Sequence, residues 1–130
     1  MKNICYESTW GCNLKCDYCI SSDNHQSIEN SESIVSYQEI IDTIASLRPE
    51  RLVISGGEPL LDNDLLEKLE CIRCKCADTF VSLSTNGAVA FDFEKLTGKI
   101  DCIDFSIPAL DGNVYQMMRG LDLVEQVKEK

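Results

Sequence analysis

Apolar residues along this chain follow two alternating patterns. Short apolar runs of strand length occur four times, and segments with apolar residues at helical spacing follow them. The strand-like segments are 2–8, 52–54, 79–84 and 102–107, and the helix-like segments are 37–47, 65–76, 92–98 and 123–130. Alternation of this kind predicts parallel strands joined by right-handed helical crossovers. We therefore predict an α/β fold with about four parallel βα units.

Local signals mark the ends of several of these elements. Residues 36–39, which run from Ser to Glu, form a capping box, and the helix behind them should stop before Pro49. Segment 52–54 is apolar on both faces, as in a parallel sheet that helices cover. Asp62 or Asn63 is expected to cap the next helix.

Composition and charge narrow the class of protein. The 130 residues suit one domain with its own core. Lys and Arg number 12 against 22 Asp and Glu, and the net charge of −10 argues against a nucleic-acid partner. No apolar run approaches the ~20 residues of a membrane span, and the start lacks the apolar segment of a secretory signal. We therefore expect a cytoplasmic protein whose eight cysteines are reduced.

One short loop concentrates candidate metal ligands. Cys12, Cys16 and Cys19 fall within eight residues, so the loop can turn three sulfurs toward one point. Thiolates bind soft metals and hold iron–sulfur clusters. A four-iron cluster usually takes four protein thiolates, and the loop supplies three. This pattern favours a cluster with one iron left open for a ligand other than cysteine.

Three further motifs follow the predicted strands. Residues 56–59 (Gly-Gly-Glu-Pro) follow the second strand, 84–87 (Ser-Thr-Asn-Gly) end the third, and Ser106 ends the fourth. Ligands of α/β folds bind at the carboxyl ends of strands, and glycines remove bulk where a ligand must approach. The alternatives are a strand-to-helix turn with a solvated Glu58 and a simple Asn-Gly turn.

Taken together, these motifs resemble the radical S-adenosylmethionine (radical SAM) enzymes. The resemblance covers nearly the whole chain. It rests on the Cys-x3-Cys-x2-Cys loop with Tyr18 before its last cysteine, and on segments 56–61, 84–87, 105–107, 111–112 and 119–120. The last three segments are similar to the Ser, Asp-Gly and Arg-Gly run of peptide-modifying (SPASM-like) members. The resemblance implies a partial (β/α)6 radical-SAM-type barrel, open on one side.

The resemblance also implies the cofactors and the residues that hold them. Cys12, Cys16 and Cys19 would hold a [4Fe–4S] cluster, and S-adenosylmethionine would chelate the open iron through its amino and carboxylate groups. Glu58 would lie near the methionine amino group and Ser106 near the ribose. The full set of expected cofactor-binding residues is Gly56, Gly57, Glu58, Pro59, Tyr18, Ser84, Asn86 and Ser106, with Thr85 as a further neighbour.

The implied reaction is reductive cleavage of the cofactor. A flavodoxin-type or ferredoxin-type donor would supply one electron, and the resulting 5′-deoxyadenosyl radical would abstract hydrogen from an unknown substrate, which the motifs suggest is a peptide or protein. Asp111 is either a substrate-side acid or a turn residue. Arg119 either pairs with a cofactor carboxylate or with a surface acid.

The implied domain, residues 1–130, stops after the fourth βα unit of the family's core. An open sheet leaves an unpaired edge, so we expect a homodimer or a second chain that completes the barrel. Rival interpretations are an iron–sulfur protein without turnover, a simple electron carrier, and a zinc-binding interaction module. The module would use two loop thiols and the second group of Cys71, Cys74 and Cys76, which is also open as an auxiliary metal site.

Overall fold

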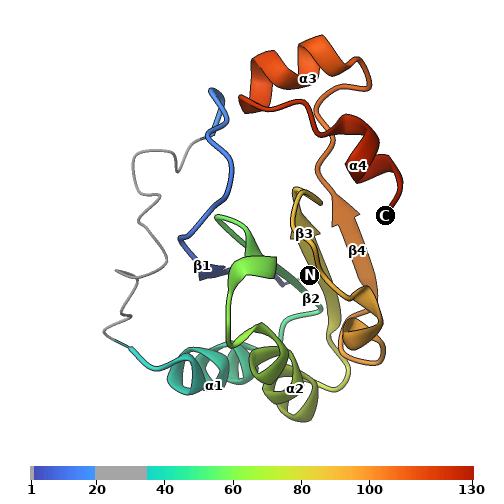
Figure 1. The fold of residues 1–130 in the computed structure, drawn as a ribbon. Helices are drawn as coiled ribbons and strands as arrows, with labels where there is room; N and C mark the ends of the chain where they lie inside the picture. The colour runs from blue at the N-terminus through green and yellow to red at the C-terminus, as the bar shows by residue number, and fades with distance from the viewer. Residues whose placement is uncertain (1, 20–34) are drawn as a thin grey trace.

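The computed structural model describes residues 2–19 and 35–130, and the polar segment 20–34 lies outside it. Four strands form one parallel sheet in the order β1-β2-β3-β4, so each strand lies beside its neighbour in sequence (Figure 1). The strands are β1 (Asn3–Thr9), β2 (Arg51–Gly56), β3 (Phe80–Thr85) and β4 (Cys102–Phe105). The parallel α/β fold predicted from the alternating patterns is confirmed.

The connections differ more from the prediction than the strands do. The α-helices are α1 (Tyr37–Leu47), α2 (Leu65–Lys75), α3 (Gly112–Arg119) and α4 (Val124–Lys128), and the 3-10 turns are η3 (Pro59–Leu61) and η4 (Phe93–Leu96). The connection between β3 and β4 therefore holds only a 3-10 turn where a short helix was expected. None of the helices in the described ranges is long and apolar enough to cross a membrane.

Helix α1 begins and ends where its sequence signals place it. The Ser36 side chain accepts from the Glu39 amide N–H, and the Glu39 carboxylate accepts from the Ser36 amide, which completes the capping box. The helix ends at Leu47, and Arg48 takes a left-handed conformation with φ 48° before Pro49. Both predicted boundaries are confirmed.

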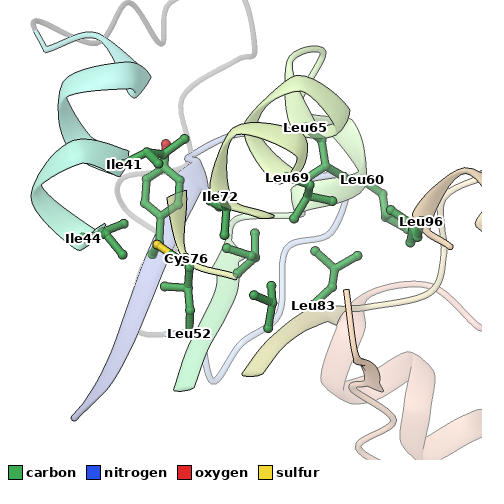
Figure 2. Packing of buried hydrophobic residues seen from close by; sticks show 13 residues of the cluster. Ile41, Ile44, Leu52, Leu60, Leu65, Leu69, Ile72, Cys76, Leu83 and Leu96 are labelled. Atoms are coloured by element: carbon green, nitrogen blue, oxygen red, sulfur yellow. The ribbon is translucent and has the colours of Figure 1, made fainter. Parts of the chain in front are cut away.

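The hydrophobic core lies between the sheet and the pair α1 and α2. Ile41 and Ile44 of α1 and Leu69 and Ile72 of α2 point toward the sheet in Figure 2. From the strands, alternate residues reach the same core, because side chains of a strand alternate between its faces. The buried strand residues of this face are Tyr6, Leu52, Ile54, Val81 and Leu83.

The other face of the sheet is more polar than predicted. Val53 lies in register with Cys5 and Ser82, and Ser82 is in turn in register with Cys102. Segment 52–54 therefore has one face in the helix-covered core and one face in a mixed polar row. The expectation of an apolar environment on both faces holds only for the side that α1 and α2 cover.

A buried ion pair connects α2 to the end of β1. Asp64 occupies the N-cap of α2 and makes no side-chain cap bond, so the expected cap at Asp62 or Asn63 is wrong. The Asp62 carboxylate instead accepts from Lys68 Nζ at 2.6 Å, and the same ammonium donates to the carbonyl oxygen of Ser8 at 3.1 Å. Because Ser8 precedes the cysteine loop, this ion pair helps fix where that loop begins.

The core assignment can be tested with one buried and one exposed apolar residue. Ile72 has no exposed surface, so Ile72→Ala should lower the free energy of unfolding by about 2–5 kcal/mol. Met117 is 77% exposed, and Met117→Ala should change it by less than about 0.5 kcal/mol. Urea denaturation followed by circular dichroism measures both; equal losses would contradict the assigned core.

Candidate functional site

The cysteine loop starts at the carboxyl end of β1 and is tied there to the end of β2. The amide N–H of Gly57 donates to the carbonyl oxygen of Thr9 at 2.8 Å, and that of Glu58 donates to the carbonyl oxygen of Gly11 at 2.7 Å. These bonds extend the pairing of β1 and β2 beyond the sheet. Gly11, which precedes Cys12, is held by this main-chain bond and by a second bond in which its own amide donates to the Thr9 hydroxyl at 3.2 Å.

Both glycines of segment 56–59 are required by close contact between two backbones. A Cβ atom on Gly57 would lie 2.7 Å from the carbonyl carbon of Gly11 and 2.8 Å from the carbonyl oxygen of Trp10. Gly56 has φ 140°, a conformation that residues with a side chain rarely adopt, and its Cβ would overlap with Thr9. The space that these glycines leave is filled by the start of the cysteine loop, where a ligand had been expected.

Glu58 is buried and its carboxylate is turned into the protein. Its Oε1 accepts from the Thr85 hydroxyl at 2.6 Å and from the Leu60 amide at 3.0 Å. Its Oε2 accepts from the Asn86 amide at 2.8 Å. Burial raises the pKa of the Glu58 carboxyl, while these three hydrogen bonds and the Arg119 charge oppose the shift. The alternative of a solvated Glu58 is wrong, because the side chain has no exposed surface.

Two further contacts hold the cysteine loop from β3 and α3. The Asn86 side-chain amide donates to Asn13 Oδ1 at 2.9 Å, and the Asp17 amide donates to the carbonyl oxygen of Met118 at 3.3 Å. Leu14 is 2% exposed, so the loop also carries its own apolar anchor. In Figure 1 the blue loop rises from β1 to the level of α3, beyond the carboxyl ends of the strands.

The three loop thiols lie close enough to influence one another. Burial raises the pKa of the Cys12 thiol, and Glu58, Cys16 and Cys19 raise it further by charge repulsion. The Leu14 amide donates to Cys12 Sγ at 3.5 Å and acts in the opposite direction. The raised pKa favours the protonated Cys12 thiol, and a coordinating metal would deprotonate it.

The thiols of the loop do not form a site for a single metal ion in the described structure. Across residues 2–19 and 35–130, no three His, Cys, Asp or Glu side chains are grouped to hold one metal ion. One zinc ion needs all its sulfurs within about 2.3 Å of the metal. A four-iron cluster binds each cysteine at a different iron and so accepts ligands that lie further apart.

The second cysteine group is not arranged as a metal site. Cys76 is buried in the core at the end of α2, whereas Cys74 is exposed and Cys71 is half-buried. These three thiols therefore face different environments. The burial of Cys76 in the hydrophobic core favours a packing role for it over a metal-ligand role.

The remaining expected cofactor-binding residues lie at or after the carboxyl ends of the strands, and their side chains differ in exposure. Pro59 and Asn86 are buried, Ser84 is half-buried, and Tyr18 and Ser106 are exposed. The buried pair supports the backbone at the ends of β2 and β3. The exposed and half-buried side chains are those that a bound molecule can reach without rearrangement of the loops.

Arg119 is a buried cation at this edge. Its Nη2 donates to the carbonyl oxygen of Ser106 at 2.6 Å and to the Ser106 hydroxyl at 3.0 Å, while its Nε has no partner in the structure. Pairing with a surface acid, one of the two expectations for Arg119, is wrong within the described residues. Asp111 caps α3 by accepting from the Val114 amide at 3.1 Å, which supports its role as a turn residue.

Three residues of this region had no distinguishing sequence signal. Asn13 is one polar loop residue among several, Lys68 sits within an apolar helical stripe, and Tyr115 has the spacing of an ordinary core aromatic. The structure places Asn13 against Asn86, Lys68 against Ser8, and Tyr115 fully buried at the start of α3. Only the charge of Lys68 within an otherwise apolar stripe could have drawn attention to it.

Sequence comparison relates the chain to known enzymes. A GTP 3′,8-cyclase of Pasteurella multocida (strain Pm70) is 33% identical over 122 residues, which cover 89% of this chain and 36% of the relative. A probable GTP 3′,8-cyclase of Pyrococcus abyssi (strain GE5 / Orsay) is 28% identical over 127 residues, which cover 96% of this chain and 40% of the relative. The chain thus spans well under half the length of these relatives.

Solved structures show the same fold. Streptococcus suis SuiB bound to S-adenosylmethionine matches with a TM-score of 0.74 at 18% identity, over 97% of this chain and 29% of that chain. Native anSMEcpe with bound AdoMet matches with a TM-score of 0.69 at 22% identity, over 98% of this chain and 38% of that chain. Both support the expected partial barrel. The family model described as the Radical SAM superfamily matches residues 6–130, and the chain therefore belongs to that superfamily, as its motifs predicted.

Proposed function

We propose that this chain holds a [4Fe–4S] cluster through Cys12, Cys16 and Cys19 and cleaves S-adenosylmethionine reductively to a 5′-deoxyadenosyl radical. The radical then abstracts a hydrogen atom from a substrate. The observation that supports the proposal is the position of the loop of Cys12, Cys16 and Cys19, which follows the carboxyl end of β1 in a parallel sheet and is held there by hydrogen bonds from the loop after β2. Membership of the superfamily supports the same cofactor pair.

The residues around the loop fit an anionic cluster. Charge on the neighbouring groups disfavours the Cys12 thiolate, and the positive iron of a bound cluster would offset that repulsion. The amide of Leu14 already donates to Cys12 Sγ, and such bonds stabilise charge on sulfur. When bound, the cluster passes one electron to the cofactor, while the protein supplies position and exclusion of water.

We further propose that segment 56–59 contacts the cofactor mainly through its backbone. Glu58 has three hydrogen bonds inside the protein and no exposed surface, so its side chain supports the loop that carries the contact. Ser106, Tyr18 and the half-buried Ser84 are the side chains available to the ribose and base. The unpartnered Nε of Arg119 is available to a cofactor carboxylate.

For the substrate, the sequence relatives favour a nucleotide over a peptide. The relatives described above are GTP 3′,8-cyclases at 33% and 28% identity, whereas the similarity to the peptide-bound SuiB is one of fold alone at 19% identity. The face of the sheet opposite α1 and α2 carries Glu7, Ser84 and Asp104, which can hydrogen-bond a polar substrate. We therefore propose GTP or a related nucleotide as the first substrate to test.

A partner chain is the remaining proposal. In the described sheet β1 and β4 each pair on one side only, so each offers backbone groups to a further strand. A homodimer or a second chain would cover these edges, and an external flavodoxin-type or ferredoxin-type protein would deliver the electron. We propose the cytoplasm as the compartment, since the site needs reduced thiols.

The central proposal predicts cofactor cleavage by the reconstituted protein. Anaerobic incubation with S-adenosylmethionine and dithionite should release 5′-deoxyadenosine, measured by chromatography. Cys16→Ser should abolish both this product and the brown cluster absorbance, because the three ligands act as a unit. Cys74→Ser, at an exposed thiol of α2, is the matched control and should retain both.

Each rival interpretation has its own outcome in this experiment. A full iron and sulfide content without 5′-deoxyadenosine would favour the iron–sulfur protein without turnover. Zinc without sulfide would favour the interaction module. With GTP added, the yield of 5′-deoxyadenosine should rise severalfold over the background; an unchanged yield would rule out GTP as the substrate.

The supporting role of Glu58 predicts a loss of stability. Glu58→Gln replaces one acceptor oxygen with an NH2 group, which then faces the Thr85 hydroxyl or the Asn86 amide, both of which are donors. Because a buried hydrogen bond is lost, the free energy of unfolding should fall by about 1–3 kcal/mol. Glu70→Gln is the control, since its exposed pair with Lys99 contributes less than about 1 kcal/mol. Chemical denaturation of the two variants without cofactors gives the comparison, and equal stability would contradict the proposed support.

The proposed partnership predicts self-association or dependence on an added chain. Multi-angle light scattering of the reconstituted protein should give at least about twice the 14.6 kDa of one chain. A monomer that releases 5′-deoxyadenosine at full rate without any added protein would rule the partnership out.

A further inference from the structure

Three strands bring a cation, an aromatic ring and a carboxylate together on the face of the sheet opposite α1 and α2. Arg51 starts β2 and lies in register with Phe80 at the start of β3. Each is followed by a fully buried residue of the core, so both side chains point to the opposite face. Asp104 of β4 follows Ile103, which packs against the same core, and therefore also lies on that opposite face.

The guanidinium of Arg51 contacts the other two groups. It lies over the Phe80 ring, 5.3 Å from the centroid, and its Nη2 is 3.9 Å from Asp104 Oδ2. That distance is too long for a hydrogen bond, and the two charged side chains are 48% and 51% exposed, so their pair adds little to the stability of the fold. Phe80 is also exposed, at 43%. The three groups are therefore open to a bound molecule.

A buried hydroxyl without a partner lies between the two charges. Arg51 of β2 is in register with Phe80 of β3. Asp104 of β4 is in register with Ser84 of β3, so the contact between the charges crosses β3 at Ser82. Ser82 has no exposed surface, and its Oγ has no hydrogen-bond partner in the described structure. Such hydroxyls are rare in folded proteins, and this one points to a ligand that takes the place of the cover above it.

The opposite charges restrict the kind of molecule that fits. Arg51 alone would suit a phosphate group, but Asp104 beside it repels an anion. A cation would in turn be repelled by Arg51. A neutral, planar group satisfies both residues, because it stacks on the guanidinium and donates hydrogen bonds from its edge to the carboxylate. Among nucleobases, guanine presents two adjacent donors of this kind, the N1–H and the N2 amino group, whereas adenine presents one.

We propose that Arg51, Ser82 and Asp104 bind the guanine base of the substrate nucleotide. This inference rests on the proposed function and assigns the base of its substrate to named residues. The base stacks on the face of the Arg51 guanidinium that is turned away from Phe80, and its N1–H and N2 amino group donate to the Asp104 carboxylate. When the base enters between the two charges, it uncovers the Ser82 hydroxyl, which then donates to O6 of the base.

The test compares the affinity of GTP with that of inosine triphosphate, which lacks the N2 amino group. Isothermal titration calorimetry of the anaerobically reconstituted protein, with S-adenosylmethionine and without reductant, gives both dissociation constants in the absence of turnover. Wild type should bind GTP about tenfold more tightly, because inosine forms one hydrogen bond fewer to a charged acceptor. Asp104→Ala should reduce this ratio to less than about twofold. Glu70→Ala removes an exposed carboxylate from α2, on the other side of the sheet, and should keep the ratio.

A second variant separates stacking from recognition of the edge of the base. Arg51→Lys keeps the charge but removes the planar group, so it should weaken both nucleotides by a similar factor of about three to ten. The ratio between them should stay as in wild type. An unchanged ratio in Asp104→Ala would overturn the proposal, as would the absence of GTP binding by wild type. Melting curves that match wild type confirm that each variant is folded.

The 5′-deoxyadenosine assay distinguishes failure of this inference from failure of the proposed function. A loaded wild type that shows the expected ratios but releases no 5′-deoxyadenosine would refute the proposed function and support the base site. A GTP-dependent rise in 5′-deoxyadenosine, together with an unchanged ratio in Asp104→Ala, would refute the base site alone.

Discussion

The hydrogen bonds to the Glu58 carboxylate are the constraint on which the site depends. They join the loop after β2 to the loop after β3, at the point where Glu58's own amide holds Gly11. A buried carboxylate without partners would cost several kcal/mol, and one with three donors is instead a rigid centre. The same residue therefore fixes the start of the cysteine loop through its backbone and the end of β3 through its side chain.

Because of this arrangement, the position of the cysteine loop does not depend on the metal that it is proposed to bind. Gly57 permits contact between backbones that any side chain would prevent, and Asn13 and Asp17 tie the rest of the loop to β3 and α3. These contacts offset the loss of conformational entropy on ordering the loop. Binding energy of the cluster is then available for charge neutralisation of the thiols.

The sequence predicted the elements well because their signals are local. The capping box at Ser36, the stop at Pro49 and the alternation of strands and helices need only neighbouring residues. The three loop cysteines were also proposed as ligands from their spacing, and that role stays a prediction. The inward turn of Glu58 was not, since it depends on donors that lie 27 and 28 residues further along the chain. Likewise, Lys68 owes its role to its contact with Ser8, 60 residues earlier in the chain.

The region after β4 supplies a buried positive charge near the cysteine loop. The chain carries a net charge of −10, and the proposed cluster with its three thiolates would add further negative charge near the buried Glu58. Among the described residues, Arg119 is the buried cation whose field reaches Glu58, Tyr18 and Tyr115 together. Within the described residues Arg119 forms no ion pair, and a cofactor carboxylate, proposed above as its partner, would compensate this buried charge. The short α3 thus contributes charge and hydrogen-bond donors to a site whose ligands come from the other end of the chain.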